Sequence, residues 1–157
     1  GRFSPPAGAG FVAVAAGEAF DASPAAIEKR VQRGTVEGIK SAFLPKKNRG
    51  GNVVLTLRLR YGKADTLFGL GPACDFLPDL MTRGTKSMNA AEISDRLDEL
   101  NASWRASGTA GTAEFTVITK RQHLKEVIEL LQQVLREPSF PTAEFSILQQ
   151  QKLSSLE

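Results

Sequence analysis

Cysteine and histidine are nearly missing from this chain of 157 residues, which contains one of each, Cys74 and His123. A single cysteine excludes an intrachain disulfide framework, which fits a reducing compartment and equally the many periplasmic domains that need no disulfide. Long apolar runs are also lacking, since none approaches the roughly 20 residues that a membrane-spanning helix requires. The apolar run at 11–16 is too short for the core of a signal peptide. We therefore expect a soluble chain with no membrane span.

The scarcity of histidine leaves few candidate catalytic sets. No cysteine, aspartate or second histidine lies close to His123 in the sequence, which favours a surface position at the start of a helix. Cys74 and His123 together remain an alternative as nucleophile and base, although a free cysteine is more often a small buried apolar side chain. Glycine-rich phosphate-binding motifs are absent. The aromatic residues do not alternate with basic ones as single-stranded nucleic acid binding requires, so we expect no nucleic acid partner.

The composition is that of an ordinary globular protein. Hydrophobic residues make up 41% of the chain and charged residues 24%, and this length suffices for one domain with a hydrophobic core. The net charge of +3 is spread along the chain and indicates no partner. A basic cluster of Lys46, Lys47 and Arg49 lies beside Gly50 and Gly51, which favours a solvated turn.

The first 26 residues are rich in glycine, alanine and proline and show neither a helical nor a strand period. This composition is typical of a linker, and "DASP" at 21–24 indicates its last turn. We expect regular structure to begin near Ile27.

Alternation of apolar and polar residues predicts a strand over 52–61. The apolar face consists of Val53, Leu55, Leu57, Leu59 and Tyr61. This pattern implies a sheet with one buried and one solvated face. Before this strand, the chain is predicted to turn at Glu37 and Gly38 and then to run extended as far as Pro45.

A helix is predicted over 71–81, with Pro72 suited to its first turn. Pro78 lies in its interior, which predicts a kink or a later start. Asp75 and Asp79 are four residues apart and share a helical face, so both carboxylates can point into the same space. Two carboxylates bind a hard cation only weakly, and the alternative is a solvated acidic face.

A second helix follows, with Asn89 and Glu92 in the pattern of a capping box. Its buried stripe is predicted to consist of Ile93, Leu97 and Leu100. Glu92 is expected to pair with Arg96 on the exposed side.

The remaining sequence predicts a hairpin over 102–120, turning at 108–111, with Phe115 and Val117 directed inward. The next helix is predicted over 123–136. Its apolar stripe is Leu124, Val127, Ile128, Leu131, Val134 and Leu135.

A last helix is expected to begin near Thr142 and still to be running at Glu157. The predicted order is strand, strand, helix, helix, strand, strand, helix, helix. This order favours an α+β domain in which helices pack on one face of an antiparallel sheet.

Residues 57–104 resemble the insulinase-type (pitrilysin-type) zinc peptidases, which carry an inverted zinc motif, HxxEH, on a helix. In that family the motif reads close to "HFLEHMLFKGT". Setting "RGT" at 83–85 on the family's "KGT" aligns the stretch without a gap. The first zinc histidine then falls on Asp75, the catalytic glutamate on Pro78 and the second histidine on Asp79, and "FL" between them is retained.

The family's third zinc ligand is a glutamate on the helix after an "FP" turn, and this position falls on or next to Ser155. The resemblance covers 27–157 and implies an α+β domain of the processing-peptidase-like metallohydrolase type, truncated at its C-terminal end. It also implies that 1–26 is a linker from a preceding half.

The resemblance implies a degenerate site. In the family, the histidines donate nitrogen atoms to zinc and the unliganded glutamate activates the zinc-bound water. Proline can do neither, and Asp75 and Asp79 have no third ligand. We therefore expect that this chain alone is not an enzyme and that it holds no metal or other cofactor.

Members of the family consist of paired halves or subunits that close around a chamber, and one partner commonly loses HxxEH. The resemblance therefore implies a non-catalytic domain that forms the chamber wall and helps to bind a peptide substrate. Its partner would be a homologous catalytic half that holds zinc, so that the whole is a zinc metalloendopeptidase, with a periplasmic location. The alternative is a structural or assembly subunit that keeps the fold without proteolysis.

Overall fold

Regular structure begins at Pro24 in the computed structural model, which describes residues 17–154. The chain divides into two units, Gly1–Gly51 and Asn52–Glu157. Most of the predicted linker at 1–26 lies outside the described residues, as does the predicted continuation of the last helix at 155–157. Within the described part, no helix has both the length and the apolar character needed to cross a bilayer.

The first unit opens with the short helix α1 (Pro24–Arg30), which begins just before Ile27. The Ser23 side chain accepts a hydrogen bond from the backbone N–H of Ala26. Pro24 occupies the first turn, where its missing N–H costs no helical hydrogen bond. This local chemistry accounts for the start of the helix.

A two-stranded hairpin follows, formed by β1 (Gln32–Val36) and β2 (Ile39–Phe43). The two turn residues have positive φ angles, 48° at Glu37 and 81° at Gly38. Positive φ at both central positions characterises the type I′ turn, whose twist matches that of the flanking strands. The predicted turn is confirmed, and β1 is a strand that the sequence did not predict.

The basic cluster of Lys46, Lys47 and Arg49 is exposed, as predicted. The Lys46 ammonium lies 4.1 Å from the centroid of the Phe20 ring, within the range of a cation–π contact. Arg30 donates hydrogen bonds to the Glu18 carboxylate at 2.7 Å and to the Pro45 carbonyl at 2.6 Å.

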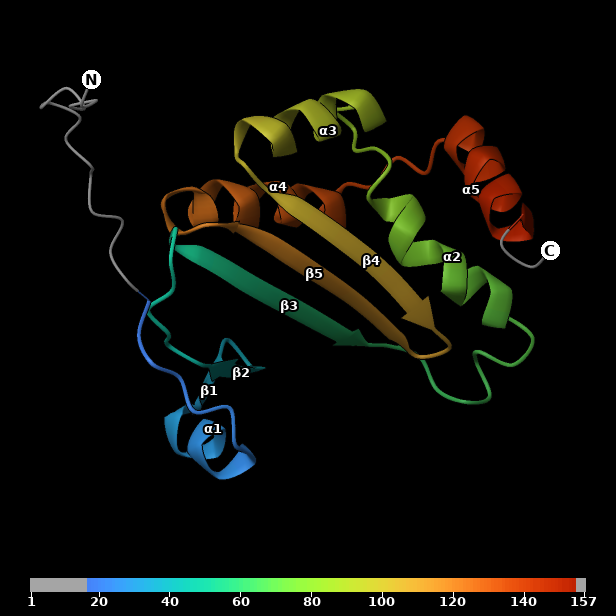
Figure 1. The fold of residues 1–157 in the computed structure, drawn as a ribbon. Helices are drawn as coiled ribbons and strands as arrows, with labels where there is room; N and C mark the ends of the chain where they lie inside the picture. The colour runs from blue at the N-terminus through green and yellow to red at the C-terminus, as the bar shows by residue number, and fades with distance from the viewer. Residues whose placement is uncertain (1–16, 155–157) are drawn as a thin grey trace, which may run out of the picture. The chain divides into compact units, whose positions relative to one another are not determined.

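The second unit is built on an antiparallel sheet in the order β3-β5-β4 (Figure 1). Its strands are β3 (Asn52–Arg60), β4 (Ser103–Thr109) and β5 (Thr112–Lys120). Exposure alternates along β3 as the sequence predicts, and Phe115 and Val117 of β5 are almost fully buried. The predicted hairpin is confirmed, although Gly108 belongs to β4 rather than to the turn.

Helices cover the apolar face of this sheet, which confirms the predicted α+β class. A short 3-10 turn, η1 (Arg121–His123), leads into α4 (Leu124–Arg136). Residues Val127 and Leu131 of α4 pack on the sheet, whereas Leu130 and Val134 pack on α3 (Ala90–Glu99).

This double packing changes the predicted stripe of α4. The helix lies against both the sheet and α3, so its buried surface is wider and displaced relative to the prediction. As a result Leu130 is buried, and Ile128, which was predicted to be buried, is 43% exposed. The sequence pattern of one helix cannot reveal a second packing partner.

The capping box of α3 is confirmed. The Asn89 side chain accepts from the Glu92 N–H, and the Glu92 carboxylate accepts from the Asn89 N–H. The predicted pair between Glu92 and Arg96 is wrong, since the Glu92 carboxylate serves the cap. Arg96 binds Glu99 instead, at 2.7 Å.

The helix α2 (Gly71–Met81) packs on β4, and a glycine permits the close approach. Pro78 lies inside α2 and has no N–H to donate to the carbonyl of Cys74, four residues earlier. A Cβ atom at Gly108 would lie 2.8 Å from the Pro78 ring and closer still to the Cys74 carbonyl oxygen. The packing of α2 on β4 therefore centres on Pro78, Cys74 and Gly108. Despite Pro78, the helix starts at Gly71 and not later.

Replacing Gly108 by alanine is expected to lower the free energy of unfolding by about 1–3 kcal/mol, because the added methyl group meets backbone that cannot move alone. The matched control is Gly71→Ala, since a Cβ at Gly71 meets nothing within 4 Å. Urea denaturation followed by circular dichroism measures both. Equal stability of the two variants would contradict the packing described.

Candidate functional site

The motif helix α2 carries Asp79, which is held by an ion pair. Its carboxylate lies 3.6 Å from Nε of Arg83, one helical turn away. Nη1 of Arg83 lies 3.6 Å from the carboxylate of Glu144, in the first turn of α5 (Thr142–Ser154). Arg83 thus bridges two carboxylates and links α2 to α5.

The second aspartate, Asp75, is exposed and does not join this ion pair. Its backbone carbonyl accepts a hydrogen bond from Nζ of Lys152 in α5 at 3.4 Å. The same ammonium lies 4.9 Å from the ring centroid of Phe76, which in turn lies 5.5 Å from the ring of Phe145. The two aspartates therefore contact different cations of the chain, although they share a helix.

The start of α2 also contacts the end of β3. The Tyr61 hydroxyl donates to the Thr109 carbonyl at 3.4 Å. Hydrogen bonding with the Cys74 thiol, followed by partial burial and the charge of Asp75, raises the pKa of Tyr61 to about 12. Cys74 is thus a buried neighbour of a neutral tyrosine.

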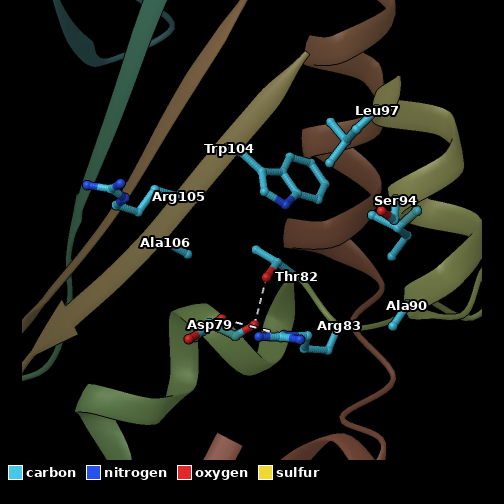
Figure 2. Close-up of a pocket in the computed structure, with 10 residues that line it drawn as sticks. Asp79, Thr82, Arg83, Ala90, Ser94, Leu97, Trp104, Arg105 and Ala106 are labelled. Atoms are coloured by element: carbon cyan, nitrogen blue, oxygen red, sulfur yellow. Dashed lines mark hydrogen bonds and ion pairs between the residues drawn. The ribbon is translucent and has the colours of Figure 1, made fainter. Parts of the chain in front are cut away.

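A hollow of about 320 Å³ lies where the end of α2, the helix α3 and the strand β4 meet (Figure 2). We call it the α2–α3–β4 hollow. It is lined by Asp79, Thr82, Arg83, Ala90, Ile93, Ser94, Leu97, Trp104, Arg105 and Ala106. Figure 2 shows the Trp104 indole directed toward α3, whereas the Arg105 guanidinium points away from it.

The strand beside this hollow is an edge of the sheet. β4 pairs with β5 on one side and with none of the described strands on the other. Alternate backbone N–H and C=O groups of an edge strand point away from the sheet and can pair with an added strand. A hollow and a strand edge therefore lie together beside the motif helix.

A sequence profile of the insulinase family (peptidase family M16) matches residues 73–155, which is more than half of the chain. The chain belongs to the insulinase family. Among curated protein sequences, none matches it significantly. This insulinase-family chain is similar in fold to a crystal structure of a peptidase M16 inactive domain from Pseudomonas fluorescens, with a TM-score of 0.67 and 17% identity. The similarity covers 80% of this chain and 31% of that one.

Insulinase-type zinc chemistry does not fit the described residues. The buried Pro78 has no group that can act as a base, and the Asp79 carboxylate is paired with Arg83. Within residues 17–154, no three histidine, cysteine, aspartate or glutamate side chains lie close enough to share an ion. Ser155, at the predicted third-ligand position, lies outside the described residues.

The structure separates the other candidate pair, Cys74 and His123. Cys74 lies against Gly108 at one end of the β4–β5 hairpin, whereas His123 follows Lys120 at the other end. Seven residues of β5 separate these ends, a distance of about 23 Å along a strand. Nε2 of His123 instead lies 2.9 Å from the side-chain amide of Gln122. A nucleophile–base pair is excluded by this distance.

Sequence reasoning missed Arg83, Glu144 and Trp104 as members of the site. The spacing of Asp79 and Arg83, four residues apart on a helix, is a signal for an ion pair that could have been used. No sequence signal relates Glu144 or Trp104 to that pair, because they come from other elements of the fold.

The raised pKa of Tyr61 predicts that the stability of the fold depends on pH. The pKa of Tyr61 is raised from 10 to about 12, so its contribution is fully present below pH 10 and is lost as the pH rises toward 12. We expect wild type to lose more stability than Tyr61→Phe over that range. Urea unfolding at pH 9 and at pH 11.5 measures the difference, and parallel losses would contradict the assignment.

The ion pair between Arg83, just after α2, and Glu144 of α5 is expected to be weak but measurable. In a double-mutant cycle of Arg83→Met and Glu144→Gln, we expect a coupling free energy of about 0.5 kcal/mol, since both groups are partly exposed. High salt should reduce this coupling by screening. A coupling energy that salt leaves unchanged would show that the variants act through packing instead.

Proposed function

We propose that this chain is part of the non-catalytic half of a zinc peptidase and that the β4 edge binds an extended peptide. The observation that carries the proposal is the position of this edge beside the α2–α3–β4 hollow, whose wall includes the motif position Asp79. An added peptide strand gains main-chain hydrogen bonds from the edge, and its alternate side chains meet the adjoining surface.

The catalytic role in this proposal belongs to a homologous half that carries HxxEH and holds zinc. The reason is chemical: proline at 78 supplies no general base, and the Asp79 carboxylate is already paired. This half would form the chamber wall opposite the zinc, and we place the complete zinc metalloendopeptidase in the periplasm. A purely structural or assembly subunit, the alternative function, would need no peptide at the β4 edge.

Peptides methylated on alternate backbone nitrogens test the edge directly. In an added strand, one alternate set of N–H groups points to β4 and the other points to solvent. We expect one methylated octapeptide of a pair to lose binding and the other to keep it, as measured by calorimetric titration against the chain. Equal affinity of the two peptides would contradict strand addition.

Cleavage assays test the catalytic assignment. With zinc present, we expect no peptide cleavage by this chain alone and chelator-sensitive cleavage when it is combined with a half that carries HxxEH. Chelator-sensitive cleavage by the chain alone would refute the assignment of Asp75, Pro78 and Asp79 as a degenerate motif. Absence of cleavage by the combined halves would favour the alternative that this chain is a structural subunit.

A further inference from the structure

We propose that the α2–α3–β4 hollow is a specificity pocket for an uncharged, apolar side chain of the bound peptide. The inference rests on the proposed function, because it assigns the peptide chemistry that the β4 edge would select. It follows from where an added strand places its side chains, from the charge balance of the hollow and from its apolar lining.

Strand geometry directs peptide side chains at the hollow. Successive side chains of a strand point to opposite faces of a sheet. Trp104 and Ala106 of β4 point to the helix-covered face, where they pack against the core. Every second side chain of a strand added beside β4 lies on that same face, next to α3 and the end of α2.

The charged residues of the lining offer no counter-charge to a ligand. Asp79 and Arg83 are paired with each other, and Arg83 is also bound to Glu144. The third charged residue, Arg105, points its guanidinium away from the hollow (Figure 2). A charged peptide side chain would therefore lose hydration here without gaining a partner, which opposes its binding.

The remaining lining combines the apolar side chains of α3 and β4 with the hydroxyl groups of Thr82 and Ser94. Ile93 and Leu97 of α3, together with Trp104, form an apolar part of the wall, and Ala90 and Ala106 add small side chains that leave the space open. A leucine-sized side chain that enters the hollow removes apolar surface on both partners from water. The hollow therefore favours leucine, methionine or phenylalanine over aspartate or lysine at the facing position.

The chain contains its own reporter for this pocket. Trp104 is its only tryptophan, and it lines the hollow. Occupation of the hollow changes the surroundings of the indole, so the intrinsic fluorescence of the unmodified chain should change when the pocket is filled. Binding elsewhere on the chain should leave this emission unchanged.

The test compares octapeptides of one alternating serine–leucine sequence in which a single central leucine is replaced by aspartate or by lysine. We expect the leucine peptide to bind at least about ten-fold more tightly than either charged peptide, or about 1.4 kcal/mol. We also expect it to shift the Trp104 emission. Calorimetric titration and fluorescence titration of the full chain give the two readouts.

Two bulky substitutions on α3 test whether the preference for leucine arises in the hollow. Ser94 lines the hollow, and Ser94→Phe is expected to fill it and abolish the preference for leucine. The matched control is Ala91→Phe, an exposed position on the same helix that does not line the hollow, which should keep the preference. If Ser94→Phe fails to fold, the peptide series in the unmodified chain decides alone.

The outcomes separate this inference from the function on which it rests. Suppose that only one methylated peptide of the pair binds, but that the leucine, aspartate and lysine peptides bind with equal affinity. This result would refute the specificity pocket and support binding at the β4 edge. A preference for leucine without any change in Trp104 emission would also overturn the pocket, since the selectivity would then arise elsewhere. Failure of every peptide to bind would overturn both.

Discussion

The close contact between α2 and β4 determines where the other features of the second unit lie. Pro78 leaves the Cys74 carbonyl without its helical partner, and Gly108 gives that carbonyl room because it has no side chain. This contact brings the start of α2 to Tyr61 and its end to Trp104. The α2–α3–β4 hollow and the neutral tyrosine are both consequences of this approach.

On the side away from β4, α2 contacts α5 (Figure 1). Arg83 bridges Asp79 and Glu144, and Lys152 lies over Phe76 while it binds the Asp75 carbonyl. Positive charges that belong to the chain thus engage the helix at two successive turns. Arg83 thereby pairs with the Asp79 carboxylate, which the resemblance places at a zinc-ligand position.

Predictions from sequence succeeded where the controlling interaction is local. The capping box of Asn89 and Glu92, the turn at Glu37 and Gly38 and the alternation along β3 all depend on neighbours within a few residues or on one solvated face. The failures involve competition or a second partner. Glu92 caps the helix while Arg96 pairs with Glu99, and Ile128 is exposed because α4 packs on α3 as well as on the sheet.

The sequence by itself determined the elements of the second unit, the α+β class and, through the stretch around "RGT", the insulinase family, whereas α1 and β1 were not predicted. The resemblance also predicts that Pro78 stands where the family has its base, and proline cannot act as one. Only the tertiary structure decided that Asp79 is paired, that Cys74 and His123 lie far apart, and that Trp104 lines a hollow at a strand edge. These contacts join residues from different elements, and their geometry depends on how those elements pack.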